Sequence, residues 1–258
     1  MQGRLAVNFL IGSVLIALSG AVFAKLEVRT SEQPLGTLRY AVVSEEITSG
    51  DIENLRRGLD EHSGNYFRNV VVLNSPGGSV DEAMKIGRLI RSLGFGVIVP
   101  REAVCFSSCV YILAAGVDKT VAGAIGIHRP YFDGGHSPTL AASLKEVESR
   151  SAQYFDEMNI PVTLTEVMFT TPPNEMRILT PVELGQYRLN MTDYVTAEKR
   201  SLLAMEILGW TRNQYEAFLA EIDYRCSIYT GSPSKMMPCM REIATKHQAP
   251  QALIDTFQ

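Results

Sequence analysis

The residues that can do chemistry gather in two short stretches of the chain. The stretch Val104–His128, VCFSSCVYILAAGVDKTVAGAIGIH, sets serines between two cysteines before an apolar run and ends on a histidine after a short apolar strand. The turn NSPGGS, at Asn74–Ser79, places two glycines between a hydrophobic strand and a helix, where backbone N–H groups can face a bound group without a Cβ in the way. A hydroxyl, a proton acceptor and an oxyanion site are the parts that acyl transfer needs.

The serine and the histidine each have an ordinary structural reading as well. A helix is expected over Ser107–Gly116, which would place Ser107 in the first turn, where the helix dipole favours negative charge. A serine at this place is also a common N-cap. His128 is expected at a strand end, from which its near-neutral imidazole can take and return a proton, although most such histidines are only core or surface residues. His136, in the loop DGGHSP, is the alternative base.

Three motifs in order carry a resemblance to a known family. LNSPGGSVDEAMKIGRLI, SSCVYILAAG and IGIHRP resemble the Clp protease proteolytic subunit and its relatives in the ClpP/crotonase fold, including signal peptide peptidase A. The similarity is greatest to exported relatives in which a CxSxC motif surrounds the serine, and it runs from about Gly36 to about Asp193. It implies an α/β fold, a repeated β-β-α superhelix with a mostly parallel sheet, and it also implies a homo-oligomer.

The resemblance implies a role for each matched residue. Ser107 would be the nucleophile, rather than Ser108, and His128 would be the base. The backbone N–H groups of Gly77 and Ser108 would form the oxyanion hole, and Gly78 would let a substrate strand approach. The two glycines also suit a plain tight turn between a strand and a helix.

The third member of a catalytic triad is where the chain departs from the family. The family's acidic residue matches Met176, and the neighbouring Glu175 and Asn174 are the candidates left to orient the imidazole. The segment Gly116–His128 is also tighter than the resemblance implies. Without an orienting carboxylate the imidazole tautomer is less fixed, which would weaken a serine and histidine pair.

Four cysteines favour disulfides in an exported chain and allow three pairings. Proximity in the sequence favours Cys105 with Cys109 and Cys226 with Cys239. The first bridge would brace the turn that carries Ser107, although an i, i+4 pair within a regular helix would be strained. Buried free thiols are the alternative. The histidines show no metal-ligand spacing with these cysteines, so no metal is expected.

The first segment, 1–24, has the layout of a secretory signal peptide. One early positive charge precedes an uncharged apolar core and a small-residue site, so cleavage is expected after Ala24. An uncleaved anchor is the alternative, because Leu5–Ala24 is about long enough, at roughly 20 residues, to span a bilayer. The expected location is therefore periplasmic or secreted, with a membrane anchor that leaves the protein facing the periplasm as the other reading.

Hydrophobic periodicity divides the remaining chain into a ClpP-like domain, 25–195, and a small helical C-terminal extension, 196–258. Alternating strands and helices predict right-handed crossovers and a largely parallel sheet. The segment Lys25–Leu35 is expected to be loose, and TLTE at Thr163–Glu166 to open a helix with a capping box. The other expected elements are strands at 36–43, 69–74 and 94–100 and helices at 51–61, 79–93 and 140–158, with further helices that start near 180 and 211.

Composition narrows the choice of function. The net charge is −4 and no basic cluster occurs, which argues against nucleic acid as a partner, and no nucleotide or cofactor motif is visible. The favoured hypothesis is an exported serine peptidase that cuts peptides or unfolded proteins without a cofactor. It would touch a membrane only if segment 1–24 stays uncleaved. The alternatives are a non-catalytic interaction module on the same fold and a crotonase-type acyl-thioester enzyme.

Overall fold

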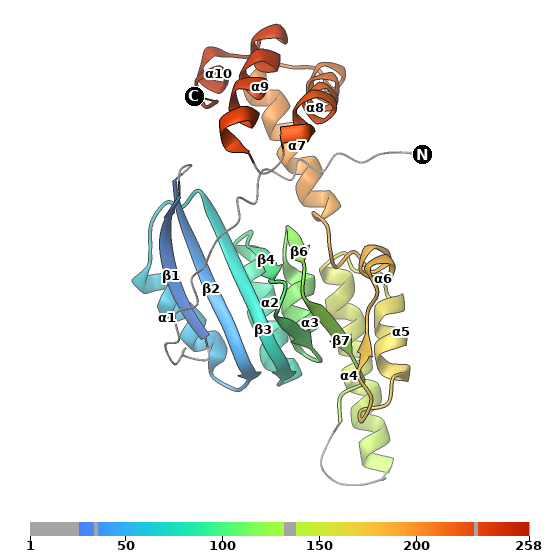
Figure 1. Cartoon of the computed structure of the whole chain (residues 1–258). Helices are drawn as coiled ribbons and strands as arrows, with labels where there is room; N and C mark the ends of the chain where they lie inside the picture. Colours follow the sequence, from blue (N-terminus) through green and yellow to red (C-terminus); the bar gives the residue numbers. More distant parts are fainter. Residues whose placement is uncertain (1–25, 34–35, 132–137, 230–231, 258) are drawn as a thin grey trace. The chain divides into compact units, whose positions relative to one another are not determined.

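The computed structural model describes residues 26–33, 36–131, 138–229 and 232–257 (Figure 1). These residues form two compact units that divide between Asp193 and Tyr194. We call them the sheet unit (26–193) and the C-terminal unit (194–257). The predicted signal segment and the loop with His136 lie outside the described residues. In the described ranges, no helix is both long and apolar enough to cross a bilayer.

The sheet unit is a mixed α/β fold on an eight-stranded, mostly parallel sheet. The ladders β1–β2 and β7–β8 are antiparallel, and the ladders between them are parallel. β3 is central, because its residues Val70–Val72 pair with β4 whereas Ser75, further along, pairs with β5. The strands are β1 (Leu26–Gln33), β2 (Gly36–Ile47), β3 (Arg68–Gly78), β4 (Gly96–Val99), β5 (Val104–Phe106), β6 (Lys119–Val121), β7 (Ala124–Ile127) and β8 (Arg177–Ile178).

The segment expected to be loose at the start of the sheet unit is instead the edge strand β1. It pairs antiparallel with β2 along its whole length. Leu26 and Val28 are buried, and Val28 presses on helix α1 (Asp51–Glu61), where a methyl group added to Gly58 would lie 2.6 Å from a Val28 methyl carbon. Burial of this alternating apolar face against α1 explains why the segment is ordered.

The remaining helices of the sheet unit begin largely where the sequence predicts. Figure 1 shows α1 to α3 on one face of the sheet. Ser79 caps α2 by accepting the Glu82 N–H, and a complete capping box forms at Thr180. The capping box expected at Thr163 is wrong, because Val162 is already the N-cap residue and has no side-chain bond. These helices are α2 (Val80–Ser92), α3 (Cys109–Ala115), α4 (Pro138–Glu157), α5 (Thr163–Thr170) and α6 (Pro181–Gln186).

The C-terminal unit is a set of helices around its own small core. Trp210, just before α8, packs edge-on against Phe218, with ring centroids 5.1 Å apart. The helix predicted to start near 211 does so, and Thr211 caps it with a complete capping box. The elements are α7 (Tyr194–Leu208), α8 (Arg212–Cys226), the 3-10 turn η1 (Ser227–Tyr229), α9 (Pro233–Lys246) and α10 (Gln251–Asp255).

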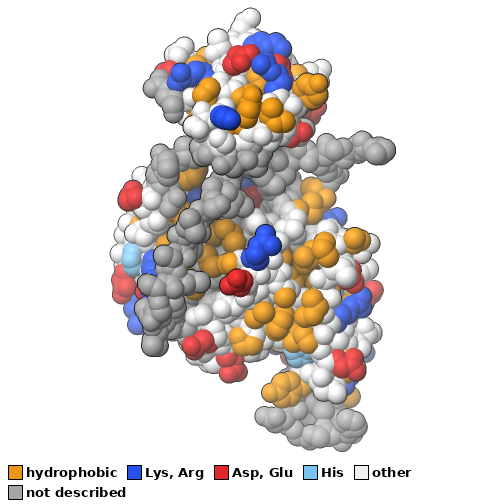
Figure 2. Space-filling model, in the orientation of Figure 1, with side chains coloured by type: hydrophobic (Ala, Val, Ile, Leu, Met, Phe, Trp, Pro, Cys, Tyr) orange, Lys and Arg blue, Asp and Glu red, His pale blue; other side chains and the backbone are white. Residues whose placement is uncertain are grey.

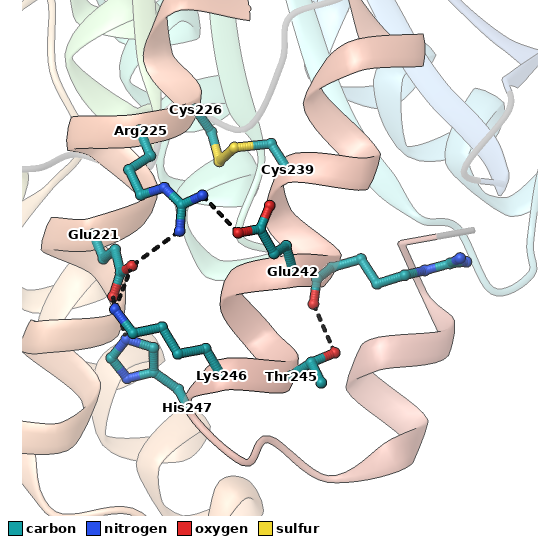
Figure 3. Close-up of polar contacts among 9 residues, drawn as sticks. Glu221, Arg225, Cys226, Cys239, Glu242, Thr245, Lys246 and His247 are labelled. Atoms are coloured by element: carbon teal, nitrogen blue, oxygen red, sulfur yellow. Dashed lines mark hydrogen bonds and ion pairs between the residues drawn. A yellow bond between two sulfur atoms is a disulfide. The ribbon is translucent and has the colours of Figure 1, made fainter.

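A polar cluster ties α8 to α9 within the C-terminal unit (Figure 3). The carboxylate of Glu221 accepts from Lys246 Nζ at 2.7 Å and pairs with His247 Nε2 at 2.9 Å. These hydrogen bonds, with a weaker one from Arg225, lower the pKa of Glu221 to about 2. The charged groups of this cluster pair with one another, so we interpret the cluster as a structural contact that holds α8 against α9.

Candidate active site

Ser107 lies in the turn between β5 and α3. Its backbone is left-handed, with φ +55°, which is uncommon for a residue other than glycine and costs about 1–3 kcal/mol. The Ser107 N–H donates to the Gly126 carbonyl at 2.9 Å, and the Ser107 carbonyl accepts from the Val110 N–H at 3.1 Å. The helix expected to start at Ser107 instead starts at Cys109 with Ser108 as its N-cap, since a left-handed residue cannot continue a right-handed helix.

The two neighbouring serines differ in exposure. Ser107 is half-buried, whereas Ser108 is only 1% exposed and its hydroxyl has no partner among the described residues. The Ser108 N–H likewise has no assigned acceptor in the described ranges. A hydroxyl sealed from solvent cannot attack an added substrate, so Ser107 is the better placed nucleophile of the two.

Two disulfides join the cysteines in the pairs that sequence proximity favours, and the free-thiol alternative is wrong. The Cys105–Cys109 bridge spans the Ser107 turn with a Cα–Cα distance of 5.2 Å. The strain expected of an i, i+4 pair in a helix does not arise, because Cys105 belongs to β5. Disulfides indicate a non-reducing environment. Within the described part of the chain, no cluster of side chains is suited to hold a metal ion.

Gly77 faces the Ser107 turn from the neighbouring strand, as the pairing of Ser75 with Cys105 requires. Its φ is +104°, and a methyl group added to it would lie 2.7 Å from Ser107 Cβ and 3.0 Å from the Ser108 nitrogen. Only glycine therefore fits. The Gly77 N–H, expected to bind an oxyanion, donates to Ser75 Oγ at 3.1 Å in this structure.

Gly78 is also required to be glycine, but for a reason that the sequence does not predict. A methyl group added to Gly78 would lie 2.2 Å from the Ile47 carbonyl oxygen of β2. The side on which its Cβ would project is therefore filled by the sheet itself. The prediction that a substrate strand approaches Gly78 therefore applies only to the side of Gly78 away from Ile47.

His128 directly follows β7, at the same end of the sheet as Ser107. The pairing of Phe106 with Gly126 sets Ser107 opposite Ile127, one residue before His128. The half-buried His128 ring holds the Arg129 carbonyl through Nδ1 at 2.9 Å. A carbonyl only accepts, so Nδ1 carries the proton and Nε2 is left as the basic nitrogen. No hydrogen bond joins His128 to the Ser107 hydroxyl among the described residues.

The place opposite His128 is apolar. The β7–β8 register pairs Gly126 with Ile178 and, continued by two residues, sets Met176 opposite His128. A methyl group added to Gly126 would lie 2.6 Å from Met176 Sδ and 2.7 Å from Phe106 Cδ1. Figure 2 shows hydrophobic side chains gathered over β7 and β8, where Met176 is 40% and Ile178 50% exposed.

Glu175 and Asn174 are the alternatives for a third catalytic member. Both are exposed, and neither has a hydrogen bond to His128 among the described residues. The structure therefore brings together Ser107, Gly77 and Ser108, and it sets His128 on the adjacent strand end, where no carboxylate of the described residues bonds to its ring.

Two features of the site are missed by the sequence reasoning. Ser75 is fully buried, and its hydroxyl donates to the Glu45 carbonyl while it accepts the Gly77 N–H. A serine two residues before a glycine turn is a known local turn former, so the NSPGG pattern contained this signal. The carbonyl of Arg129, which orients the His128 ring, has no side-chain signature and could not be found from residue types.

Comparison with known proteins gives a distant likeness. No family model matches the chain, and no curated protein matches it. One of the solved structures that it resembles is a serine-to-alanine mutant of the 1510-N membrane-bound stomatin-specific protease, at 20% identity and a TM-score of 0.44. That match covers 62% of this chain and 82% of the other. A likeness this distant does not identify catalytic residues.

Proposed function

We propose that this protein is a serine peptidase that hydrolyses peptide bonds in peptides or unfolded chains, with Ser107 as nucleophile and His128 as base. The observation that carries the proposal is the left-handed backbone of Ser107 in a strand-turn-helix, where a strained turn presents the hydroxyl. Strained non-glycine residues cluster at active sites. Of the five in the described ranges, Ser107 alone lies between a strand and a helix, whereas the others lie within β2 or after a helix end. Gly77 packs closely against this turn, and a larger residue at position 77 would clash with Ser107 Cβ and the Phe106 carbonyl.

His128 would act through Nε2. In this mechanism Nε2 takes the proton of the Ser107 hydroxyl during attack and returns it to the leaving amine. The Arg129 carbonyl holds the Nδ1 proton, which selects the required tautomer, but a neutral carbonyl stabilises the imidazolium less than a carboxylate does. The hydrogen bond between His128 and Ser107 would have to form on binding of substrate, as catalytic hydrogen bonds often do.

The oxyanion would be bound by the Ser108 N–H together with the Gly77 N–H. The Ser108 nitrogen lies beside Gly77 and has no assigned acceptor in the described ranges. The Gly77 N–H is now held by Ser75 Oγ, so it would have to exchange this partner for the oxyanion. Loss of one such donor costs about a hundredfold to a thousandfold in rate.

The proposal includes the finer fold and location. We propose that the sheet unit is a ClpP/crotonase-type superhelix and that segment 1–24 is a signal peptide cleaved after Ala24. What supports export is the pair of disulfides, which form in oxidising compartments. What supports the superhelix is the order of the three sequence motifs along a mostly parallel sheet.

A second candidate is a non-catalytic interaction module on the same fold. It is favoured by the methionine that stands opposite His128 and by the absence, among the described residues, of a bond between His128 and Ser107. Such a module would bind unfolded chains without cutting them. Binding without turnover is the result that separates it from the peptidase.

The experiment incubates an unfolded protein with the mature chain, both disulfides intact, and measures degradation by the appearance of new amino termini. We expect Ser107→Ala to abolish cleavage and Ser108→Ala to retain it. A His128→Gln variant should lose at least a hundredfold, because the base is removed. Thermal unfolding of each variant checks that the fold is unchanged. No cleavage by folded wild type, across mixed peptide libraries, would leave the binding module as the account.

A further inference from the structure

We infer that the Cys105–Cys109 disulfide is a positioning device for Ser107, so that the peptidase becomes reactive only after this bond has formed. The inference rests on the proposed function. It assigns these cysteines an active part, because they would hold the nucleophile in its attacking conformation without touching the substrate.

The disulfide encloses a segment of only three residues. Cys105 lies in β5, where it pairs with Ser75 of β3 on one side and Ile125 of β7 on the other. Cys109 opens α3, all of whose residues are buried. Both ends of the bridge are therefore fixed in the core, and Ser107 lies midway between them with its φ of +55°.

Among the described residues, the hydrogen bonds on the turn itself are few. The Ser107 N–H donates to the Gly126 carbonyl, and the Val110 and Tyr111 N–H groups donate to the carbonyls of Ser107 and Ser108. A serine prefers a right-handed or extended backbone, so a loosened turn would relax towards these conformations. Relaxation would swing the hydroxyl away from Gly77 and separate the nucleophile from the oxyanion site.

The covalent step itself is a disulfide exchange. The two thiols lose two electrons and two protons to an oxidant of the disulfide class, which becomes a dithiol as the Cys105–Cys109 bond forms. Both cysteines are 0% exposed in the folded chain, so the exchange belongs to folding and is slow afterwards. Reactivity would therefore be acquired in the oxidising compartment and withheld in a reducing one.

The second disulfide offers a matched control. Cys226–Cys239 joins α8 to α9 in the C-terminal unit and includes no residue of the proposed site. Removal of either bond deletes one cross-link from the unfolded chain. A general loss of stability would affect both variants, whereas a positioning effect belongs only to the bond that spans Ser107.

The test compares the double variant Cys105→Ala, Cys109→Ala with Cys226→Ala, Cys239→Ala. We would measure the rate of fluorophosphonate labelling, and kcat and KM on a cleaved peptide, under conditions in which circular dichroism shows each protein to be folded. For the first variant we expect labelling and kcat to fall at least tenfold with KM unchanged. The control should stay within twofold of wild type. Equal labelling of the first variant and wild type would overturn the inference.

A second measurement covers the case in which the alanine pair does not fold. Wild type is unfolded, reduced and refolded at a series of dithiol-to-disulfide ratios, and the thiols left at each pair are alkylated and counted by mass spectrometry. Labelling should decline in step with opening of Cys105–Cys109 and return on reoxidation. A decline that follows Cys226–Cys239, or no decline with the first bond open, would overturn the inference. Failure of the proposed function itself is distinct, because oxidised wild type would then not be labelled at all.

Discussion

A single added methyl group at Gly77 should disable the site. Gly77 has φ +104°, and its missing Cβ would lie 2.7 Å from Ser107 Cβ and 2.7 Å from the Phe106 carbonyl oxygen. The variant Gly77→Ala therefore meets both backbone strain and a clash with main-chain atoms that cannot swing aside. Because the clash falls on the Ser107 turn, the displaced atoms are those that carry the nucleophile.

The magnitude follows from separating the two effects. Gly50 has a nearly equal φ of +98° with nothing within 4 Å of its added methyl group, so Gly50→Ala reports strain alone. We expect that control to cost about 1–2 kcal/mol of unfolding free energy. Gly77→Ala adds overpacking of about 1–3 kcal/mol, for a total of about 2–5 kcal/mol.

The assay pairs urea unfolding with the rate of fluorophosphonate labelling. We expect Gly50→Ala to be labelled like wild type and Gly77→Ala at least about a hundredfold more slowly, since the turn that carries the nucleophile and its oxyanion donor is displaced. The reasoning fails if Gly77→Ala is labelled within threefold of wild type, or if its loss of stability equals that of Gly50→Ala.

Three further predictions concern charge. Burial raises the pKa of Glu82, but hydrogen bonds led by that from the Ile52 N–H outweigh burial and set the folded pKa below 4.5. The ionised Glu82 carboxylate therefore stabilises the fold at neutral pH, and this contribution is lost as pH falls. In urea unfolding, Glu82→Gln should cost about 2 kcal/mol at pH 7 and should reduce the loss of unfolding free energy at acid pH. Burial lowers the pKa of Lys119 from 10.5 to about 8. Between these pH values the unfolded chain binds more protons than the folded chain, so the unfolding free energy of wild type should rise by about 2 kcal/mol from pH 8 to 10. The same rise of unfolding free energy with pH in Lys119→Met would contradict this. Hydrogen bonds led by that from Lys246 lower the pKa of Glu221 to about 2. The stabilisation that Glu221 contributes is therefore present above its unfolded pKa and is lost as pH falls towards 2. Glu221→Gln should lower the melting temperature of the C-terminal unit at pH 7 more than at pH 3.

The sequence predicts those parts of the fold that depend on local patterns. Strand and helix periodicity and the helix starts near 79, 180 and 211 follow from residue types and spacing, and sequence proximity favours the two disulfide pairings that the structure has. The edge strand β1 is not predicted, because its order comes from pairing with β2 and from contact with α1, and neither can be inferred from its own residues.

The residue types of the candidate site come from the sequence, whereas its conformation does not. Ser107 and Gly77 are found from motifs, yet the left-handed backbone of Ser107 depends on the Gly126 carbonyl, on a strand about twenty residues away. The bond that occupies the Gly77 N–H and the Arg129 carbonyl that orients His128 are equally tertiary facts. Helix periodicity favours a start at Ser107, whereas the turn held between sheet and helix delays it to Cys109.

The central claim is that Ser107 is an activated nucleophile, and the most direct measurement is the site of fluorophosphonate modification by peptide mass spectrometry. The mature protein, folded and with both disulfides closed, is labelled beside Ser107→Ala, Ser108→Ala and His128→Ala. We predict one modified residue, Ser107, in wild type and in Ser108→Ala, no modification in Ser107→Ala, and a rate at least about a hundredfold lower in His128→Ala. A label on another serine, or a folded wild-type protein that takes no label, would contradict the account.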